Sequence, residues 1–124
     1  MAVNVLIVDD SVAMRMILQR ALRKTSLPVD KIFEAGDGCL ALEVLKKETV
    51  NVILADINMP NMDGLQMLAE LQTNEKWKQL PVVMISTESS QAKVMEALRL
   101  GAKGFIRKPF VPDDVGEKLA SFVQ

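Results

Sequence analysis

Short apolar runs alternate along the chain with longer stretches in which apolar residues recur at helical spacing. Such runs, bounded by polar and turn-forming residues, are typical of buried strands. They predict strands at residues 3–8, 32–35, 52–55, 82–85 and 105–106. The stretches between them are typical of amphipathic helices. The stripes that predict these helices are Met14, Ile17, Leu18 and Ala21; Ala41, Val44 and Leu45; Leu65, Leu68 and Leu71; Val94, Met95 and Leu98; and Val115, Leu119 and Phe122.

The order of these elements predicts the fold. Ser11 is a suitable N-cap for the first helix, and Gly101 is a suitable C-terminal stop for the fourth. Strands that are apolar on both faces and separated by helices indicate a parallel sheet covered on both sides. With right-handed crossovers, five β/α units give a doubly wound (βα)₅ sandwich, an α/β fold with a five-stranded parallel sheet. Ligands bind such sheets beyond the carboxyl ends of the strands, so the residues that follow each strand are the informative ones.

Composition narrows the class of protein. The 124 residues are 49% hydrophobic, which suits one domain, residues 1–124, with its own core. A net charge of −1 gives no global attraction to nucleic acid or to an anionic membrane. Cys39 is the only cysteine and histidine is absent, which excludes an intrachain disulfide and the usual zinc sites. The start lacks signal-peptide features and no apolar run is long enough to span a bilayer, so we expect a soluble, cytoplasmic protein.

Polar residues capable of chemistry follow four of the predicted strands. They are Asp9 and Asp10 after the first, Asp56 after the third, Ser86 and Thr87 after the fourth, and Lys108 after the fifth. Each one by itself has an ordinary structural explanation as a turn former, a helix-terminal charge or a solvated side chain. The carboxyl ends of parallel strands meet at one edge of the sheet, however, so the predicted topology brings all of these residues to one cleft.

The residue types in this cleft suit a metal and a phosphoryl group. Three carboxylates repel one another and favour a bound cation. Hard oxygen ligands favour Mg²⁺, Mn²⁺ or Ca²⁺, and Mg²⁺ suits a site with few protein ligands because it keeps several waters. A metal beside a lysine and a hydroxyl suits phosphoryl transfer, in which the protein positions groups and compensates charge. Asp56 leaves the central strand and is the best candidate for the nucleophile.

Five motif positions, in this order, resemble a known family. They are Val8-Asp9-Asp10, Asp56 within the segment DINMPNMDG, Ser86, and Lys108-Pro109-Phe110. Over essentially its whole length the chain resembles the receiver domains of bacterial two-component response regulators, and among them the CheY-like regulators of chemotaxis. The resemblance implies a flavodoxin-like fold with strand order 2-1-3-4-5. It also implies a single-domain response regulator of a phosphorelay, with chemotaxis as a candidate pathway.

The resemblance assigns roles to the residues of the cleft. It makes Asp56 the phosphoacceptor, which takes its phosphoryl group from a sensor histidine kinase or a small phosphodonor. It implies Mg²⁺ as the cofactor, held by Asp10, Asp56, the main-chain carbonyl of Asn58 and, through water, Asp9. The implied phosphoryl-binding residues are Ser86, Thr87 and Lys108.

Further roles concern switching and the lifetime of the phosphoryl group. Ser86 stands where the family more often has Thr, and Phe105 stands at the aromatic switch position, where chemotaxis regulators have Tyr. Asn58 and Glu88 occupy the positions that tune dephosphorylation, which implies a short-lived phosphoryl group. The Lys108–Pro109 peptide is expected to be cis, a conformation that bonds to proline adopt at modest cost.

The resemblance also implies partners. A downstream protein effector would bind the face formed by the last two helices and the last strand. That face carries Lys93, Arg99, Lys103, Arg107 and Lys118. The implied molecule is a monomer when unphosphorylated, makes no direct contact with nucleic acid or membrane, and catalyses only its own phosphorylation and dephosphorylation.

Three alternatives remain beside this interpretation. One is a pseudo-receiver that binds a partner without phosphorylation. Another is an aspartyl-nucleophile phosphatase, although such enzymes often carry a second aspartate where this chain has Asn58. A flavin carrier is the third, and it is disfavoured because Asp9 and Asp10 would repel the cofactor's phosphate at the end of the first strand.

Overall fold

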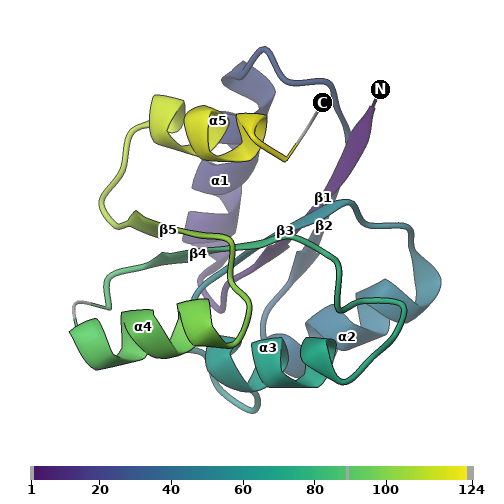
Figure 1. Ribbon diagram of the computed structural model, residues 1–124. Coiled ribbons are helices and arrows are strands. Elements are labelled where there is room, and N and C mark those ends of the chain that lie inside the picture. The colour runs from purple at the N-terminus through teal and green to yellow at the C-terminus, as the bar shows by residue number, and fades with distance from the viewer. Residues whose placement is uncertain (1, 89, 123–124) are drawn as a thin grey trace.

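Parallel strands form a single sheet in the order β2-β1-β3-β4-β5 in a computed structural model that describes residues 2–88 and 90–122 (Figure 1). The strands are β1 (Val3–Val8), β2 (Val29–Ala35), β3 (Val52–Ala55), β4 (Val82–Ser86) and β5 (Gly104–Arg107). The helices between and after them are α1 (Val12–Lys24), α2 (Gly38–Lys47), α3 (Gly64–Gln72), α4 (Gln91–Arg99) and α5 (Pro112–Ala120). The predicted doubly wound (βα)₅ fold and its strand order are confirmed.

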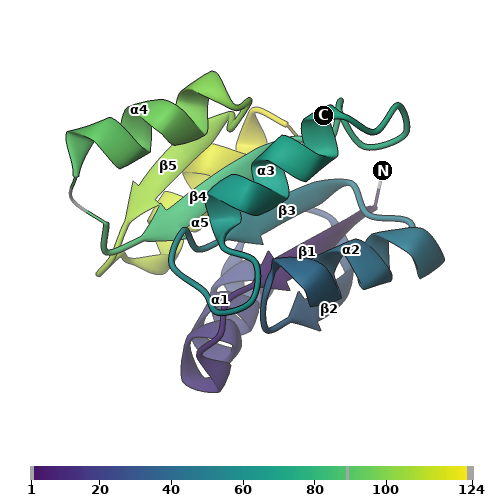
Figure 2. The same cartoon turned by 90° about the horizontal axis from the view of Figure 1, so that it is seen from below.

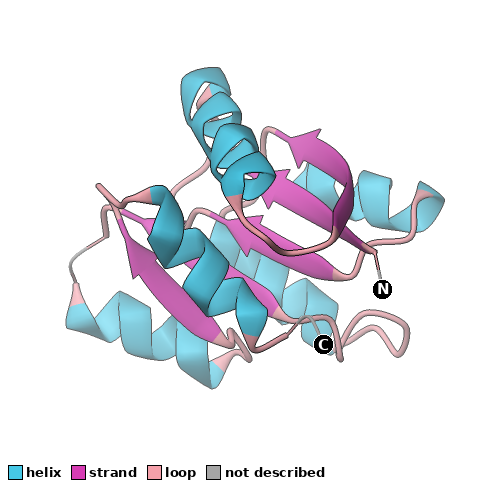
Figure 3. Cartoon of the chain, turned by 90° about the horizontal axis from the view of Figure 1, so that it is seen from above, coloured by secondary structure: helices cyan, strands magenta, loops and turns pink. Residues whose placement is uncertain are grey.

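The sheet lies between two layers of helices. Helices α2, α3 and α4 cover one face (Figure 2), and α1 and α5 pack side by side over the other (Figure 3). Alternate residues of each inner strand belong to the two cores, so that Ile53 and Ala55 face the first layer while Val52 and Leu54 face the second. This two-sided burial explains why the inner strands are apolar at consecutive positions.

Polar side chains at the helix N-termini fix where the helices begin. The Ser11 hydroxyl accepts a hydrogen bond from the Met14 N–H, which confirms the predicted N-cap of α1. Asp63 and Gln66 form a reciprocal capping box at the start of α3. These caps place the first turn of each helix directly after the loop that leaves the preceding strand.

Some boundaries and faces differ from the sequence prediction. β2 begins at Val29 rather than at residue 32, and α5 ends at Ala120, before Phe122. Ile17, Met95 and Leu98 continue the predicted apolar stripes of α1 and α4, yet they are 48%, 57% and 44% exposed. These stripes are wider than the strip of each helix that the sheet covers, so their outer residues face solvent. Within the described part of the chain, no helix has both the length and the apolar character needed to cross a membrane.

Asp37 joins the start of α2 to the loop that follows β3. One carboxylate oxygen accepts from the Leu40 N–H at 2.8 Å, and the other accepts from the Asn61 side-chain amide, also at 2.8 Å. Asn61 has a φ of 65°, a left-handed conformation that asparagine tolerates better than most residues. The Asn61 amide, followed by the Leu40 N–H, lowers the pKa of Asp37 from its ordinary value of 3.8. Asp37 therefore stabilises both elements in its charged form.

Replacing Asp37 by alanine should lower the free energy of unfolding by about 1–2 kcal/mol, because it removes an N-cap together with the bond to Asn61. Asp37→Asn keeps a capping oxygen but removes the charge. A carboxyl group with a depressed pKa in the folded state contributes stability above its unfolded value near 3.8, and this contribution disappears as the pH falls through the folded value. Denaturant unfolding should therefore separate wild type from Asp37→Asn most at neutral pH. A gap that stays constant below pH 3.8 would contradict this account.

Candidate functional site

Three carboxylates meet at the carboxyl edge of the sheet. Asp9 and Asp10 follow β1, and Asp56 follows β3; one oxygen from each lies within 4.8 Å of the others. The Asp9 N–H donates to the Ala35 carbonyl at 3.0 Å, and the Asp56 N–H donates to the Val8 carbonyl at 2.9 Å. The strand pairing thus continues one residue past each strand and fixes the main chain of the cluster. Asp9 and Asp56 are buried, whereas Asp10 is exposed.

Lys108 follows the edge strand β5, and its side chain extends to the acidic cluster at the same carboxyl edge of the sheet. The main-chain N–H of Lys108 donates to the Ser86 carbonyl at 3.0 Å, so the main chain of Lys108 is held beside the end of β4. Its ammonium lies 2.8 Å from an Asp9 oxygen and 3.4 Å from an Asp56 oxygen, and only 10% of the side chain is exposed. The expected cis peptide between Lys108 and Pro109 is present. Lys108 therefore compensates part of the charge of two buried carboxylates.

A chain of polar contacts links the end of β4 to the loop that follows β3. The Ser86 side chain is fully buried, and its hydroxyl oxygen accepts from the Glu88 N–H at 3.1 Å. One Glu88 carboxylate oxygen accepts from the Asn58 amide at 3.3 Å, and the other accepts from the Ser90 N–H at 3.0 Å. The Ser90 N–H, followed by the Asn58 amide, lowers the pKa of Glu88, and the nearby charge of Lys93 acts in the same direction. The two residues expected to tune dephosphorylation thus contact each other.

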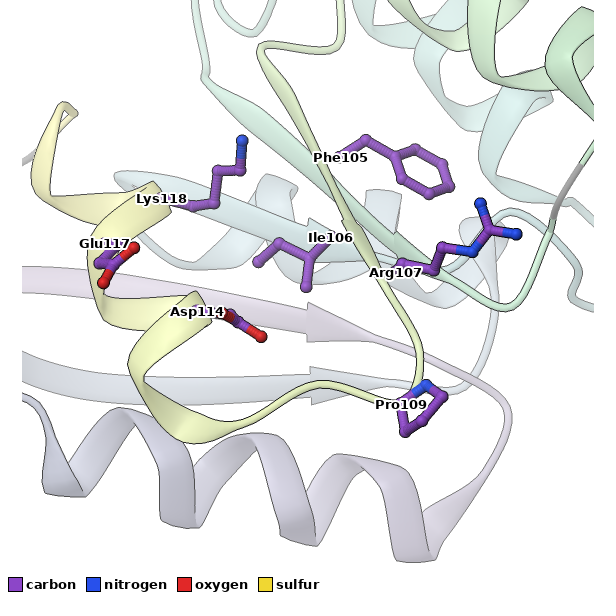
Figure 4. A pocket seen from close by; sticks show the side chains of 7 residues that line it. All are labelled: Phe105, Ile106, Arg107, Pro109, Asp114, Glu117 and Lys118. Atoms are coloured by element: carbon purple, nitrogen blue, oxygen red, sulfur yellow. The ribbon is translucent and has the colours of Figure 1, made fainter.

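Two predicted site residues lie outside this arrangement. Thr87 is exposed beyond the end of β4. Phe105 is half-buried on β5 and lines a separate pocket of about 510 Å³ between β5 and α5 (Figure 4). The other residues that line this pocket are Ile106, Arg107, Pro109, Asp114, Glu117 and Lys118.

The face formed by α4, β5 and α5 is mixed in charge rather than basic. Arg99 pairs with Glu96, and Lys93 lies 3.6 Å from Glu88. In Figure 4, Asp114 and Glu117 project from α5 beside the pocket, together with Lys118. Lys93, Arg99 and Lys118 therefore have acidic neighbours, which weakens any general attraction of this face to acidic partners.

Two residues that contact the site were not singled out from the sequence. Gly64 donates its N–H to the Ile57 carbonyl at 2.7 Å, and a Cβ at this position would lie only 2.2 Å from the Asp56 carbonyl oxygen. Arg15 donates to the Asp9 carbonyl from α1. A glycine at the first position of a helix, where alanine is the better helix former, is a signal for such a close approach. Arg15 gives no comparable signal, because it resembles any polar residue on a helix surface.

The donor set fits a hard divalent cation. All side-chain donors of the acidic cluster are carboxylate oxygens, which suit Mg²⁺, Mn²⁺ or Ca²⁺. Two of the three carboxylates are buried, where mutual repulsion is screened less than at the surface. The arrangement can therefore bind a cation and, through Lys108, an anionic group beside it.

Comparisons with known proteins agree with this geometry. Residues 5–120 match the model of the response regulator receiver domain. A chemotaxis protein CheY homolog from Campylobacter jejuni is 39% identical over 117 residues, which cover 94% of this chain and 88% of the relative. The structure of chemotaxis protein CheY4 from Vibrio cholerae superposes with a TM-score of 0.88 at 31% identity, covering 99% of this chain and 100% of the other.

A third comparison concerns the metal. The structure of the Mn²⁺-bound form of response regulator Rcp1 superposes with a TM-score of 0.79 at 25% identity, covering 96% of this chain and 90% of that one. A relative with this fold therefore binds a divalent cation. Together, the match to the family model, the strand order and the convergence of Asp9, Asp10, Asp56 and Lys108 place the chain: it belongs to the family of response regulator receiver domains.

Proposed function

We propose that this chain is the receiver of a response regulator and accepts a phosphoryl group on Asp56 from a sensor histidine kinase. The observation that carries the proposal is the position of the Lys108 ammonium between the buried carboxylates of Asp9 and Asp56, with Asp10 beside them. A cation-binding cluster next to a nearly buried ammonium is the charge arrangement that phosphoryl transfer requires.

The covalent step needs little from the protein beyond position and charge. An Asp56 carboxylate oxygen forms the new bond to phosphorus while the bond from phosphorus to the donor's imidazole nitrogen breaks, and the imidazole leaves with the bonding electrons. Lys108, which already faces Asp56 at 3.4 Å, binds a phosphoryl oxygen. The Ser86 hydroxyl is the next donor at this edge, and it binds the phosphoryl group after leaving its contact with the Glu88 N–H.

Asp10, Asp56 and the main-chain carbonyl of Asn58 would hold Mg²⁺, and Asp9 would reach it through water. A bound Mg²⁺ supplies positive charge that offsets the charge of the transferring phosphoryl group. Asp9 also holds Lys108 in place at 2.8 Å, so the acidic cluster and the phosphoryl-binding ammonium are positioned by the same side chain. Thr87, which is exposed beyond the end of β4, is proposed to contribute a second hydroxyl to the phosphoryl group.

The output would follow from the added charge. Phosphorylation adds roughly −1.5 to −2 charge units beside Lys108 and Ser86. Movement of Ser86 toward that charge changes the space beside β4, and the half-buried Phe105 ring on the neighbouring strand adjusts to it. A downstream protein would then bind the face of α4, β5 and α5. Chemotaxis is the proposed pathway, because two of the relatives reported above, from Campylobacter jejuni and Vibrio cholerae, carry that role in their names.

The proposal also covers location, oligomeric state and catalysis. The chain acts in the cytoplasm, as a monomer when unphosphorylated, and catalyses only its own phosphorylation and dephosphorylation. The proposal includes a short-lived phosphoryl group, and the contact between Asn58 and Glu88, the two residues assigned to dephosphorylation, supports it.

Intact-mass spectrometry after incubation with acetyl phosphate tests the proposal. Wild type should gain one phosphoryl group in the presence of MgCl₂ and none in its absence. Asp56→Asn should gain none, because the amide is a poor nucleophile, whereas Asp30→Asn at the exposed edge of β2 should behave as wild type. An unmodified wild-type protein would favour a pseudo-receiver, and multiple turnover of phosphoesters would favour a phosphatase.

A further inference from the structure

Arg15 connects α1, β1 and β2 at the edge of the acidic cluster. One guanidinium nitrogen donates to the main-chain carbonyl of Asp9 at 2.6 Å, and Nε donates to a Glu34 carboxylate oxygen at 2.9 Å. Only 17% of the Arg15 side chain is exposed, compared with 39% of Glu34. A guanidinium that makes two charge-assisted bonds while mostly buried has a fixed position.

Asp9 is held at each of its polar groups. Its N–H donates to the Ala35 carbonyl, and its own carbonyl accepts from Arg15. One side-chain oxygen accepts from the Ser11 N–H at 2.9 Å, and the other contacts the Lys108 ammonium at 2.8 Å. Of these partners, Ala35 and Ser11 contribute main-chain groups that the fold already fixes. Arg15 and Lys108 are the side-chain partners, and the sequence-based assignment included only Lys108.

We infer that Arg15 is a positioning residue for cation binding, acting through the Asp9 carbonyl, and that Glu34 orients it. The inference rests on the proposed function, because it concerns the same metal site. Arg15 sets the direction of the peptide that joins Asp9 to Asp10, and these two residues supply two of the three clustered carboxylates. Loss of Arg15 frees that peptide to rotate and lets the carboxylates move apart.

Whether cation affinity falls or rises when Arg15 and Glu34 are both made neutral distinguishes a positioning role from a purely electrostatic one. Arg15 contacts Asp9 directly, while Glu34 reaches it only through Arg15. Removing both charges leaves the net charge unchanged and removes the nearer cation, so electrostatics alone would strengthen cation binding. If Arg15 positions the ligands, the same change should instead weaken cation binding. A partner that orients a ligand changes metal affinity by roughly ten- to a hundredfold, and we expect about tenfold for this main-chain contact.

The experiment is a titration of the purified full chain with MnCl₂, in which electron paramagnetic resonance counts the free Mn²⁺. The double variant Arg15→Met/Glu34→Gln should bind Mn²⁺ about tenfold more weakly than wild type. Arg23→Met is the matched control: Arg23 also extends from α1, but it donates to the Val29 and Asp30 carbonyls at the far end of β2. Arg23→Met should lower the unfolding temperature, because these two contacts are lost, but its Mn²⁺ affinity should equal that of wild type.

A second variant keeps the test decisive if the double variant does not fold. Arg15→Lys retains the charge and can make one of the two contacts, so its Mn²⁺ affinity should lie between those of wild type and the double variant. Wild-type affinity in every folded Arg15 variant would overturn this inference and leave the proposed function intact. A wild-type protein that binds no Mn²⁺ would overturn the metal site itself and the inference with it.

Discussion

Replacing Lys108 with methionine should lower the free energy of unfolding by about 3–5 kcal/mol in the absence of a divalent cation. Methionine has a similar length, so the change removes the ammonium and little volume. Asp9 and Asp56 would then be two buried carboxylates without their shared cation, at 1% and 9% exposure. Removal of one partner from a buried ion pair is costly because the other partner keeps its desolvation penalty.

Mg²⁺ should restore much of the stability that Lys108→Met loses, but it should not restore phosphorylation. With Lys108 absent, a divalent cation is the remaining positive charge that can enter the cluster, so MgCl₂ should raise the unfolding temperature of Lys108→Met more than that of wild type. Phosphorylation by acetyl phosphate should nevertheless slow by about a hundredfold, because the variant lacks the ammonium that we propose binds the phosphoryl group. These two results together would indicate that Lys108 competes with the metal in the resting protein and assists it during the proposed transfer.

Lys103→Met is the control for the lysine substitution. Lys103 is exposed just before β5, and its N–H donates to the Val82 carbonyl through the main chain alone. Its replacement should change stability by no more than about 0.5 kcal/mol. Equal stabilisation of Lys108→Met and wild type by MgCl₂, measured by thermal unfolding, would show that the ammonium and the metal do not share the cluster.

The fold was predictable because burial on both faces of the sheet is a strong local signal. The inner strands keep apolar residues at consecutive positions, and the sequence pattern located all three of them to within one residue at each end. β2 was the exception. After Val29 this edge strand continues with the exposed polar residues Asp30 and Lys31, so the uninterrupted apolar pattern began only at residue 32. Pairing with β1 and the contacts from Arg23 extend the strand to Val29, and no local pattern reports such contacts.

The candidate site, like the fold, was predictable in part. Asp9, Asp10, Asp56, Ser86 and Lys108 were predictable because topology alone brings the ends of parallel strands together. Which of them would touch was not predictable, since the pairing of Lys108 with Asp9 depends on side-chain geometry across residues far apart in sequence. Arg15 was not predictable for a related reason: it contacts a main-chain atom of the site, and sequence motifs describe side chains. Gly64 also approaches a main-chain atom, and its only signal in the sequence is a glycine at the start of a helix.

Gly64→Ala should be strongly destabilising although it leaves every charged group in place. A Cβ at position 64 would lie 2.2 Å from the Asp56 carbonyl oxygen and 2.9 Å from the Ile57 Cα, distances that real Cβ atoms do not adopt. Both neighbours are main-chain atoms of the loop after β3, so the start of α3 and this loop must separate. We expect a loss of about 3 kcal/mol in the free energy of unfolding, at the upper end of the range for overpacking.

The same displacement in Gly64→Ala should impair the site, because Asp56 belongs to the loop after β3 that has to move. A shift of its main chain moves the carboxylate away from Lys108 and the acidic cluster, so phosphorylation by acetyl phosphate should slow even at temperatures where the variant is folded. Gly104→Ala on β5 is the matched control, since its added Cβ would lie 3.7 Å from the nearest side-chain atom, an ordinary contact. If Gly64→Ala unfolded and reacted like Gly104→Ala, the close packing of α3 against Asp56 could not be what holds the proposed phosphoacceptor in place.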